Sequence, residues 1–333
     1  MKRRWQFVLV LCLVVGISSG VSHVAVGWLK IKAGWGGYKY YGPADSKVAG
    51  ILYSSSPGYD GIDWNVVAEM IGGGIESWAT PGSSPSEWEE VPKSEPDVKY
   101  TFIAVSAHDL NEYFLCDFRA DIVPFNRTLW DLRQCAADWQ FSKRMLSQYP
   151  VMLVRKLFPT VGRSDGMMVG IRAKLLKLIG QSIDAGAAPK FGGTAKSDIQ
   201  ERVSDWDEAR VQRRLVLLRA ACQGKQSFDG PKRLAFLRLL HGAEEHSEVI
   251  LVVVPQPPIY RNALLPLAAM QQFDEELAQV KRECPGLHVV RLDRLPTLDH
   301  NDLFYDDVHL NMYGQQIATA AFQARLRQVA QEP

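Results

Sequence analysis

Residues near the C-terminus have the types and spacing needed for acid–base chemistry. In segment 304–314, Asp306 stands three residues before His309, so a carboxylate can lie beside an imidazole on one tight turn. Such a carboxylate fixes the ring tautomer and stabilises the imidazolium that forms when the histidine accepts a proton. Asp307 is an alternative partner, but the i, i+3 spacing favours Asp306. The pair predicts a general base that requires a nucleophile.

A serine run far upstream offers hydroxyl groups for this purpose. Ser54, Ser55 and Ser56 follow an apolar run over 48–53 that is typical of a buried strand, and they precede a predicted helix. A serine cluster after a strand often does no more than cap the next helix. The residues alone therefore leave two interpretations open, a nucleophile or a capping turn.

The elements that must position these residues are short apolar strands alternating with helices. This alternation predicts an α/β fold with a parallel sheet covered on both faces. Ligands bind beyond the carboxyl ends of such strands, where we expect the polar loops 54–63, 80–86 and 106–112 and the Asp306/His309 pair to meet. The expected strands are 48–53, 74–79, 99–105, 249–254 and 287–292, and the expected helices are 61–72, 125–149, 262–284 and 311–330.

In the order of these blocks the chain resembles the SGNH (GDSL-type) hydrolase superfamily, over residues 46–135 and 247–330. The blocks are a serine loop, a glycine loop, a polar loop and a final D-x-x-H. The resemblance implies a flavodoxin-like, three-layer α/β/α fold with a parallel sheet. It also implies that Ser56 attacks an ester carbonyl, that His309 is the base, and that Asp306 orients His309.

The resemblance assigns groups that stabilise the oxyanion as well. Gly82 in the second loop matches the family's oxyanion-hole glycine. The family presents an asparagine donor in its third block, and Asn111 is the residue of the third loop that can donate. His108 in the same loop is an alternative base. Serines replace the family's Gly-Asp before the nucleophile, and Ser55 is the nearest alternative nucleophile.

The closest likeness is to the membrane-anchored branch linked to acylation of envelope polysaccharides, which includes the D-alanyl transfer protein of teichoic acids. It implies an exported serine esterase or O-acyltransferase that acts on acyl esters, such as acetyl esters, of a cell-envelope or extracellular polysaccharide or a lipid. Neither a cofactor nor a metal is expected. The alternative is a catalytically degenerate scaffold or binding protein that works with polysaccharide-assembly proteins, because the Gly-Asp of the nucleophile motif is missing.

The N-terminus indicates the compartment. Basic residues at 2–4 precede a run over 5–29 that contains no charged side chain, and a helix of that length can cross a bilayer. We expect residues 1–30 to be an uncleaved anchor or, alternatively, the signal peptide of a secreted protein. A linker over 31–46 follows. Because the basic side stays in the cytoplasm, the remaining chain would face the periplasm or cell exterior from the bacterial inner membrane.

The bulk composition is that of an ordinary globular protein. The chain has 333 residues, of which 47% are hydrophobic and 23% charged, and its net charge of +1 gives no reason to expect a nucleic-acid partner. Its five cysteines show no metal-ligand spacing, and Cys116–Cys135 is a candidate disulfide only if the chain is exported. We expect one α/β domain over 47–330 with a helical insertion near 151–247.

Overall fold

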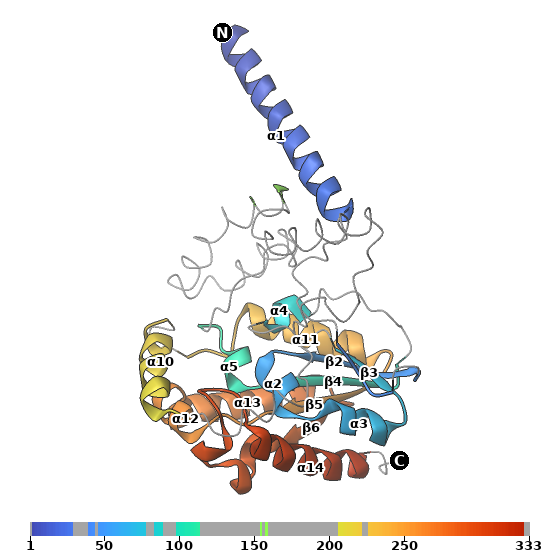
Figure 1. The fold of residues 1–333 in the computed structure, drawn as a ribbon, viewed down its shortest axis with the longest axis vertical. Helices are drawn as coiled ribbons and strands as arrows, with labels where there is room; N and C mark the ends of the chain where they lie inside the picture. The colour runs from blue at the N-terminus through green and yellow to red at the C-terminus, as the bar shows by residue number, and fades with distance from the viewer. Residues whose placement is uncertain are drawn as a thin grey trace, which may run out of the picture. The chain divides into compact units, whose positions relative to one another are not determined.

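A computed structural model shows two compact units in the chain (Figure 1). One contains Met1–Trp35 and Phe118–Phe191, and the other contains Gly36–Asp117 and Gly192–Pro333. The predicted catalytic residues all belong to the second unit. The structure describes residues 2–28, 39–43, 46–77, 83–88, 98–113, 154, 157–158, 206–221 and 226–329.

The first unit contains helix α1 (Lys2–Trp28), at the position of the expected anchor. Ser19 Oγ of this helix donates to the carbonyl oxygen of Leu157 at 2.5 Å. Within the described ranges, no helix combines the length and the apolar character needed to cross a bilayer. The anchor and the localisation derived from it stay predictions. The expected helix 125–149 and the cysteine pair Cys116–Cys135 lie outside the described residues.

The second unit is built on a six-stranded sheet with the order β1-β3-β2-β4-β5-β6. All adjacent pairs are parallel except β1–β3, so the sheet is mixed but mostly parallel. The predicted α/β class is confirmed. The strands are β1 (Lys39–Tyr41), β2 (Val48–Ser54), β3 (Gly74–Ser77), β4 (Tyr100–Val105), β5 (Glu248–Val253) and β6 (His288–Arg291).

Strand β1 lies inside the segment predicted to be a linker, 31–46. It adds to the sheet because Tyr40 packs directly over Gly74 of β3: a Cβ atom at Gly74 would come within 1.9 Å of the Tyr40 hydroxyl. That hydroxyl donates to the carbonyl oxygen of Ser46 at 2.5 Å. Three residues are too few to show a strand period, so this antiparallel edge strand was not predicted.

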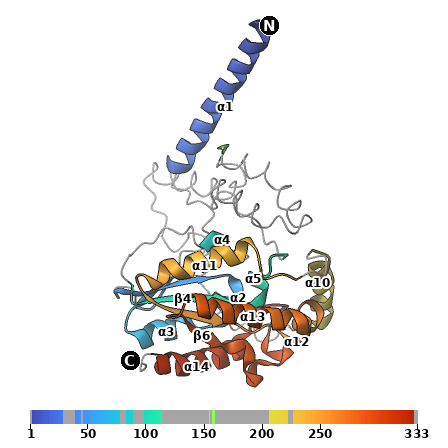
Figure 2. The ribbon, with the colours of Figure 1, turned by 180° about the vertical axis from the view of Figure 1, so that it is seen from behind.

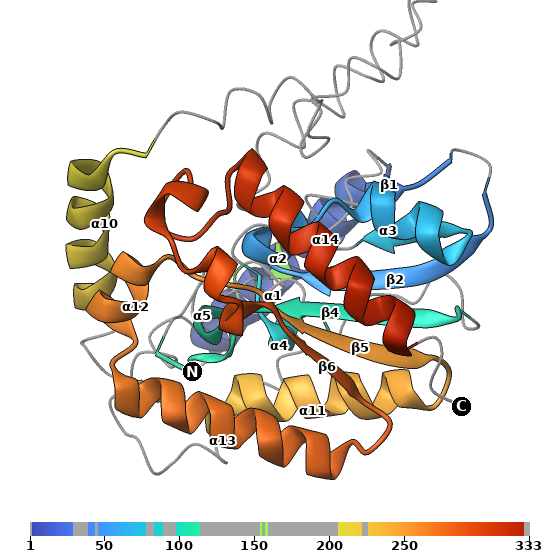
Figure 3. The same cartoon turned by 90° about the horizontal axis from the view of Figure 1, so that it is seen from below.

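Helices cover the sheet on both faces (Figures 1, 2 and 3). Figure 3 shows α3 (Trp64–Ile71) and α14 (Met312–Val329) on one face, and α11 (Pro231–Glu244) and α13 (Leu267–Glu283) on the other. The arrangement is compatible with a three-layer α/β/α fold. Helix α11 falls within the stretch expected to be an insertion, yet it packs against β5 and therefore covers the sheet.

The expected helix 262–284 is divided into α12 (Pro258–Leu264) and α13. The break falls at Leu265, which has φ −125° and ψ 73°. It precedes Pro266, and the proline ring disfavours helical geometry for the residue before it. The expected helices 61–72 and 311–330 correspond to α3 and α14.

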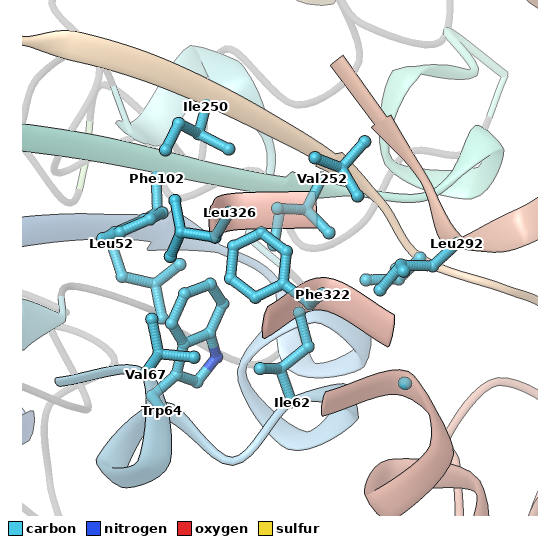
Figure 4. Packing of buried hydrophobic residues seen from close by; sticks show 14 of the residues in the cluster. Leu52, Ile62, Trp64, Val67, Phe102, Ile250, Val252, Leu292, Phe322 and Leu326 are labelled. Atoms are coloured by element: carbon cyan, nitrogen blue, oxygen red, sulfur yellow. The ribbon is translucent and has the colours of Figure 1, made fainter. Parts of the chain in front are cut away.

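The core on the α3/α14 face joins the beginning of the domain to its end (Figure 4). The Trp64 ring of α3 lies 5.4 Å from Phe102 of β4 and 5.7 Å from Phe322 of α14, measured between ring centroids. Each of these side chains is fully buried, which contributes about 1.5–3 kcal/mol for an aromatic of this kind. Other members of the cluster shown in Figure 4 are Leu52, Ile62, Val67, Ile250, Val252, Leu292 and Leu326.

Candidate active site

The serine turn lies at the carboxyl edge of the sheet, between two adjacent parallel strands. Ser54 at the end of β2 pairs with Ala104 near the end of β4. Helix α2 (Ser56–Gly61) begins directly after the turn. Gly58 permits its close approach, because a Cβ there would lie 2.0 Å from Ser54 Oγ and 2.7 Å from the Ala104 Cβ. The first turn of α2 is therefore packed onto the ends of both strands.

A buried hydrogen bond joins this turn to the loop that follows β4. Ser55 Oγ donates to Asp109 Oδ1 at 2.5 Å, and the backbone N–H and Oγ of Ser106 donate to Asp109 Oδ2 at 2.7 and 2.9 Å. Burial raises the pKa of Asp109, although the hydrogen bonds from Ser55 and Ser106 oppose that shift. Asp109 belongs to the short helix α5 (Ala107–Leu110), so the carboxylate fixes α5 against the serine turn.

This bond distinguishes the two candidate nucleophiles. The Ser55 hydroxyl is engaged with Asp109, and only 2% of the residue is exposed. Ser56 is partly exposed, and its hydroxyl has no hydrogen-bond partner among the residues that the structure describes. Ser56 is therefore the hydroxyl of this turn that remains available to a substrate.

The expected carboxylate–imidazole contact is present at the C-terminal loop. His309 Nδ1 lies 2.8 Å from Asp306 Oδ2, and Asp306 Oδ1 accepts the backbone N–H groups of Val308 and His309 at 2.9 and 2.8 Å. Burial acts to raise the pKa of Asp306, but the hydrogen bonds and charge of His309, with these two backbone donors, hold it below its usual value. The Tyr305 ring stacks on the imidazole at a centroid distance of 5.3 Å.

The other nitrogen of His309 is available for proton transfer. His309 Nε2 is buried and has no hydrogen-bond partner within the part of the chain that the structure covers. A ring whose Nδ1 is held by a carboxylate and whose Nε2 is unengaged has the orientation required of a general base. Asp306 rather than Asp307 supplies that carboxylate.

Asp307 has a different partner, on a helix within the stretch expected to be a helical insertion. Arg214 Nε of α10 (Glu208–Ala221) lies 2.7 Å from Asp307 Oδ1, and Arg210 donates to the carbonyl oxygen of Tyr305 at 3.2 Å. Burial raises the pKa of Asp307, against the charge of Arg214. Two arginines of α10 thus hold the loop that carries the catalytic candidates.

The serine turn and the histidine loop are fixed to each other through α2 and α14. Gln315 Nε2 donates to the carbonyl oxygen of Asp60 at 2.7 Å, and the backbone N–H of Asp63 donates to Thr319 Oγ1 at 2.9 Å. The hydrogen bond between Ser56 and His309 that a triad requires is not formed. Catalytic hydrogen bonds are often long without substrate and tighten only in the complex.

Two residues were assigned to the oxyanion hole, Gly82 and Asn111. Gly82 lies outside the described residues, although its neighbour Ser83 donates to the carbonyl oxygen of Ser54 at 3.3 Å. Asn111 is completely buried; its amide donates to Gln226, and its Oδ1 accepts the backbone N–H of Ser227 at 3.2 Å. Asn111 holds the segment that enters α11, so the geometry gives no support to its predicted role as an oxyanion donor.

His108 is held by a residue that the sequence analysis missed. Its Nδ1 lies 2.5 Å from the hydroxyl oxygen of Tyr260, which follows β5 at the same edge of the sheet. Burial and, to a smaller extent, the charges of Lys232, Arg214 and His309 together lower the pKa of His108 to about 3. So low a basicity makes His108 a poor general base. The available signal for Tyr260 was its place in the segment 255–260, which follows a predicted strand.

Another polar group at this edge, the side-chain amide of Gln256, is relevant to ligand binding. The Gln256 side-chain nitrogen, in the loop after β5, is buried and without a hydrogen-bond partner among the described residues. An unsatisfied buried amide next to a candidate site can serve a bound ligand. Across the described ranges, no group of three or more His, Cys, Asp or Glu side chains is arranged to hold a metal ion.

Comparisons with protein-family models and with curated proteins found no match for this chain. The function is therefore inferred from the site itself.

Proposed function

We propose that the chain is a serine esterase or O-acyltransferase of the SGNH type, acting on acyl esters such as acetyl esters of a cell-envelope or extracellular polysaccharide. The strand order supports the proposal: without β1, it reads β3-β2-β4-β5-β6, which is the flavodoxin-like order 2-1-3-4-5. In sheets of this order the ligand binds where the strand order reverses, here between β2 and β4. Ser56 and the His108 loop follow those two strands.

The observation that carries the proposal is the His309–Asp306 pair, half-buried at this edge, with Nε2 of His309 buried and unengaged among the described residues. In the proposed reaction, Ser56 Oγ forms a bond to the acyl carbon as its proton passes to His309 Nε2. The carbonyl electron pair moves to oxygen, where the backbone N–H groups of Ser56 and Gly82 are the proposed donors. Collapse of this tetrahedral intermediate then expels the alcohol, which takes the proton from His309. An acyl-enzyme remains on Ser56. Water or a sugar hydroxyl resolves that ester.

The test uses the full chain in detergent, assayed for release of acetate from an acetylated polysaccharide and from a small aryl acetate. Ser56→Ala should abolish turnover, and mass spectrometry should locate a fluorophosphonate adduct on Ser56. Ser55→Ala is the matched control, because it removes a neighbouring hydroxyl that is already engaged with Asp109. Turnover that survives Ser56→Ala would remove Ser56 from the mechanism.

A second candidate is a non-catalytic scaffold or binding protein of polysaccharide assembly. The specific observation in its favour is that Ser56 and His309 share no hydrogen bond, although both are described by the structure. The fluorophosphonate experiment separates the two candidates. A folded protein that binds polysaccharide but is not labelled supports the scaffold.

The proposed substrate also suits the proposed location. A helix at the N-terminus would tether the enzyme to the bacterial inner membrane, with its α/β unit in the periplasm or at the cell exterior, where envelope polysaccharides are modified. Polysaccharide-assembly proteins are the partners that this location implies. Alkaline extraction of membranes tests it, because a tethered chain stays with the membrane, whereas a secreted chain with a cleaved signal peptide is released.

A further inference from the structure

The loop that carries His108 lies beside the serine turn of the proposed active site. Its neighbour Asp109 accepts a hydrogen bond from Ser55 at 2.5 Å, which fixes the His108 loop against the turn that carries Ser56. The strands before the two loops also pair, because Ser54 at the end of β2 lies opposite Ala104 near the end of β4. A polar side chain at this junction can reach a substrate that Ser56 attacks.

The surroundings of His108 keep its ring neutral. It is partly buried, and the groups whose charge acts on it are Lys232 of α11, Arg214 of α10 and His309, all of which disfavour a second positive charge. Its pKa is lowered to about 3. At neutral pH His108 therefore carries a single N–H.

Tyr260 contacts one of the two nitrogens that can carry that hydrogen. The Tyr260 hydroxyl is completely buried and lies 2.5 Å from His108 Nδ1. When the hydroxyl donates to Nδ1, the proton of the neutral imidazole must be on Nε2. A neutral imidazole fixed in this way is a hydrogen-bond donor that gives up no proton at neutral pH.

We propose that His108, oriented by Tyr260, donates its Nε2–H to the acyl oxygen that becomes negative when Ser56 attacks the ester carbonyl. This inference rests on the proposed function. His108 itself transfers no proton: the Ser56 proton goes to His309 and later to the departing alcohol. As the C–O bond to that alcohol breaks, the electron pair on the acyl oxygen re-forms the carbonyl double bond.

A neutral donor suits this position better than a charged one. A cationic ring next to His309 would oppose the positive charge that His309 gains when it accepts the Ser56 proton. A neutral N–H stabilises the negative oxygen without that opposition. Asn111 is engaged with the segment before α11, so its amide does not supply this donor.

The kinetic test compares His108→Leu, which removes the donor at similar volume, with His108→Gln, whose side-chain N–H reaches nearly the position of Nε2. Loss of one oxyanion donor typically lowers kcat about 10²–10³-fold, so the Leu variant should lose that much with little change in KM. The Gln variant should retain most of the activity. Tyr260→Phe should fall between them, and His300→Leu, at an exposed histidine before the short helix Asn301–Leu303, should match the wild type.

Two readouts separate this role from a structural one. The acid limb of kcat/KM should be the same in His108→Gln and in the wild type, because His309 alone must lose its proton. In the full chain with labelled histidine, the nitrogen chemical shifts should show His108 as the neutral Nε2–H form down to about pH 5. The second measurement needs no variant and does not depend on turnover.

The outcomes distinguish this inference from the proposed function. If Ser56→Ala abolishes turnover while His108→Leu keeps the wild-type kcat, the inference fails and the proposed function stands. A His108 that carries its proton on Nδ1, or that is charged at pH 6, also overturns it. If the folded wild-type chain neither hydrolyses acetyl esters nor reacts with the fluorophosphonate at Ser56, both fall together.

Discussion

Two loops at the carboxyl edge of the sheet contain the same two residue types but use them in opposite ways. After β6, Asp306 binds the ring of His309 directly. After β4, Asp109 stands next to His108 in sequence, yet its carboxylate accepts hydrogen bonds from Ser55 and Ser106. His108 is bound instead by the Tyr260 hydroxyl. The two histidines therefore face a carboxylate in one loop and a phenol in the other.

The difference shows that the partner of an imidazole decides its chemistry. The carboxylate beside His309 can stabilise an imidazolium, and its own pKa is lowered by that contact. His108 has no such carboxylate on Nδ1, and burial with nearby positive charge lowers its pKa to about 3. One ring is arranged to gain a proton, and the other is arranged to stay neutral.

The largest loss of activity is expected from removing the carboxylate contact that distinguishes His309 from His108. In Asp306→Asn the amide can no longer stabilise the imidazolium and can favour the wrong tautomer, which lowers kcat about 10⁴-fold in comparable triads. Acetate release from an aryl ester is the measurement. Asp307→Asn is the matched control, since it changes the adjacent carboxylate and its pairing with Arg214. Equal losses in both variants would contradict the distinct role assigned to Asp306.

Acid should destabilise the fold through His108. Its folded-state pKa of about 3 lies below the unfolded value of about 6.5, so the unfolded chain binds an extra proton in between. Stability is therefore lost as the pH falls from about 6.5 towards 3, by an amount on the order of a few kcal/mol. Urea unfolding at several pH values measures this loss. His108→Gln should flatten the pH dependence in that window, and an unchanged slope would oppose the assignment.

Asp306 should affect the stability of the fold at a lower pH than His108 does. Its folded pKa is depressed, so its contribution to stability is fully present above its unfolded value of about 3.9 and is lost as the pH falls through the folded pKa. Asp306→Asn should therefore alter the unfolding curve below about pH 4, in addition to any change that the loss of its contact with His309 causes between about pH 5 and 6.5. A change confined to the upper window would reverse the roles assigned to the two loops.

A smaller effect is expected from Asp109→Ala. This change leaves the buried Ser55 hydroxyl and the Ser106 backbone N–H without an acceptor, which typically costs about 1–3 kcal/mol per unsatisfied group. Denaturant unfolding gives the value. Ser55→Ala is the control, because it removes a single donor and should cost less. If both variants are as stable as the wild type, the bond between the loops does not hold the serine turn in place.

The smallest effect is expected from Arg214→Gln. The Arg214 side chain is largely exposed, so solvent screens its attraction to Asp307, but the Asp307 side chain is only 2% exposed and loses its cation. Stability should therefore fall by about 1 kcal/mol, and the loop that carries His309 loses one of its two side-chain attachments to α10. A modest fall in kcat, measured with the same aryl acetate, is expected together with this small loss of stability. Arg213→Gln, in the same helix, serves as the control.

Much of the fold was predictable because its signals are local. Five of the strands are short apolar runs, and the strand and helix periods that predict them depend only on neighbouring residues. Strand β1 and the division of 262–284 at Pro266 were missed or misjudged. The first has too few residues for a period, and its stability comes from Tyr40 packing on Gly74.

By itself the sequence determined the α/β class, the order of the loops at one sheet edge, and the i, i+3 spacing that joins Asp306 to His309. Only the tertiary structure decided that Ser55 is bound to Asp109, that Asp307 pairs with Arg214, and that His108 meets Tyr260. The physical reason is the separation along the chain between the residues that make each contact. Pairing over one helical turn follows from backbone geometry, whereas these three contacts join residues far apart in the chain and form only when the sheet brings their loops together.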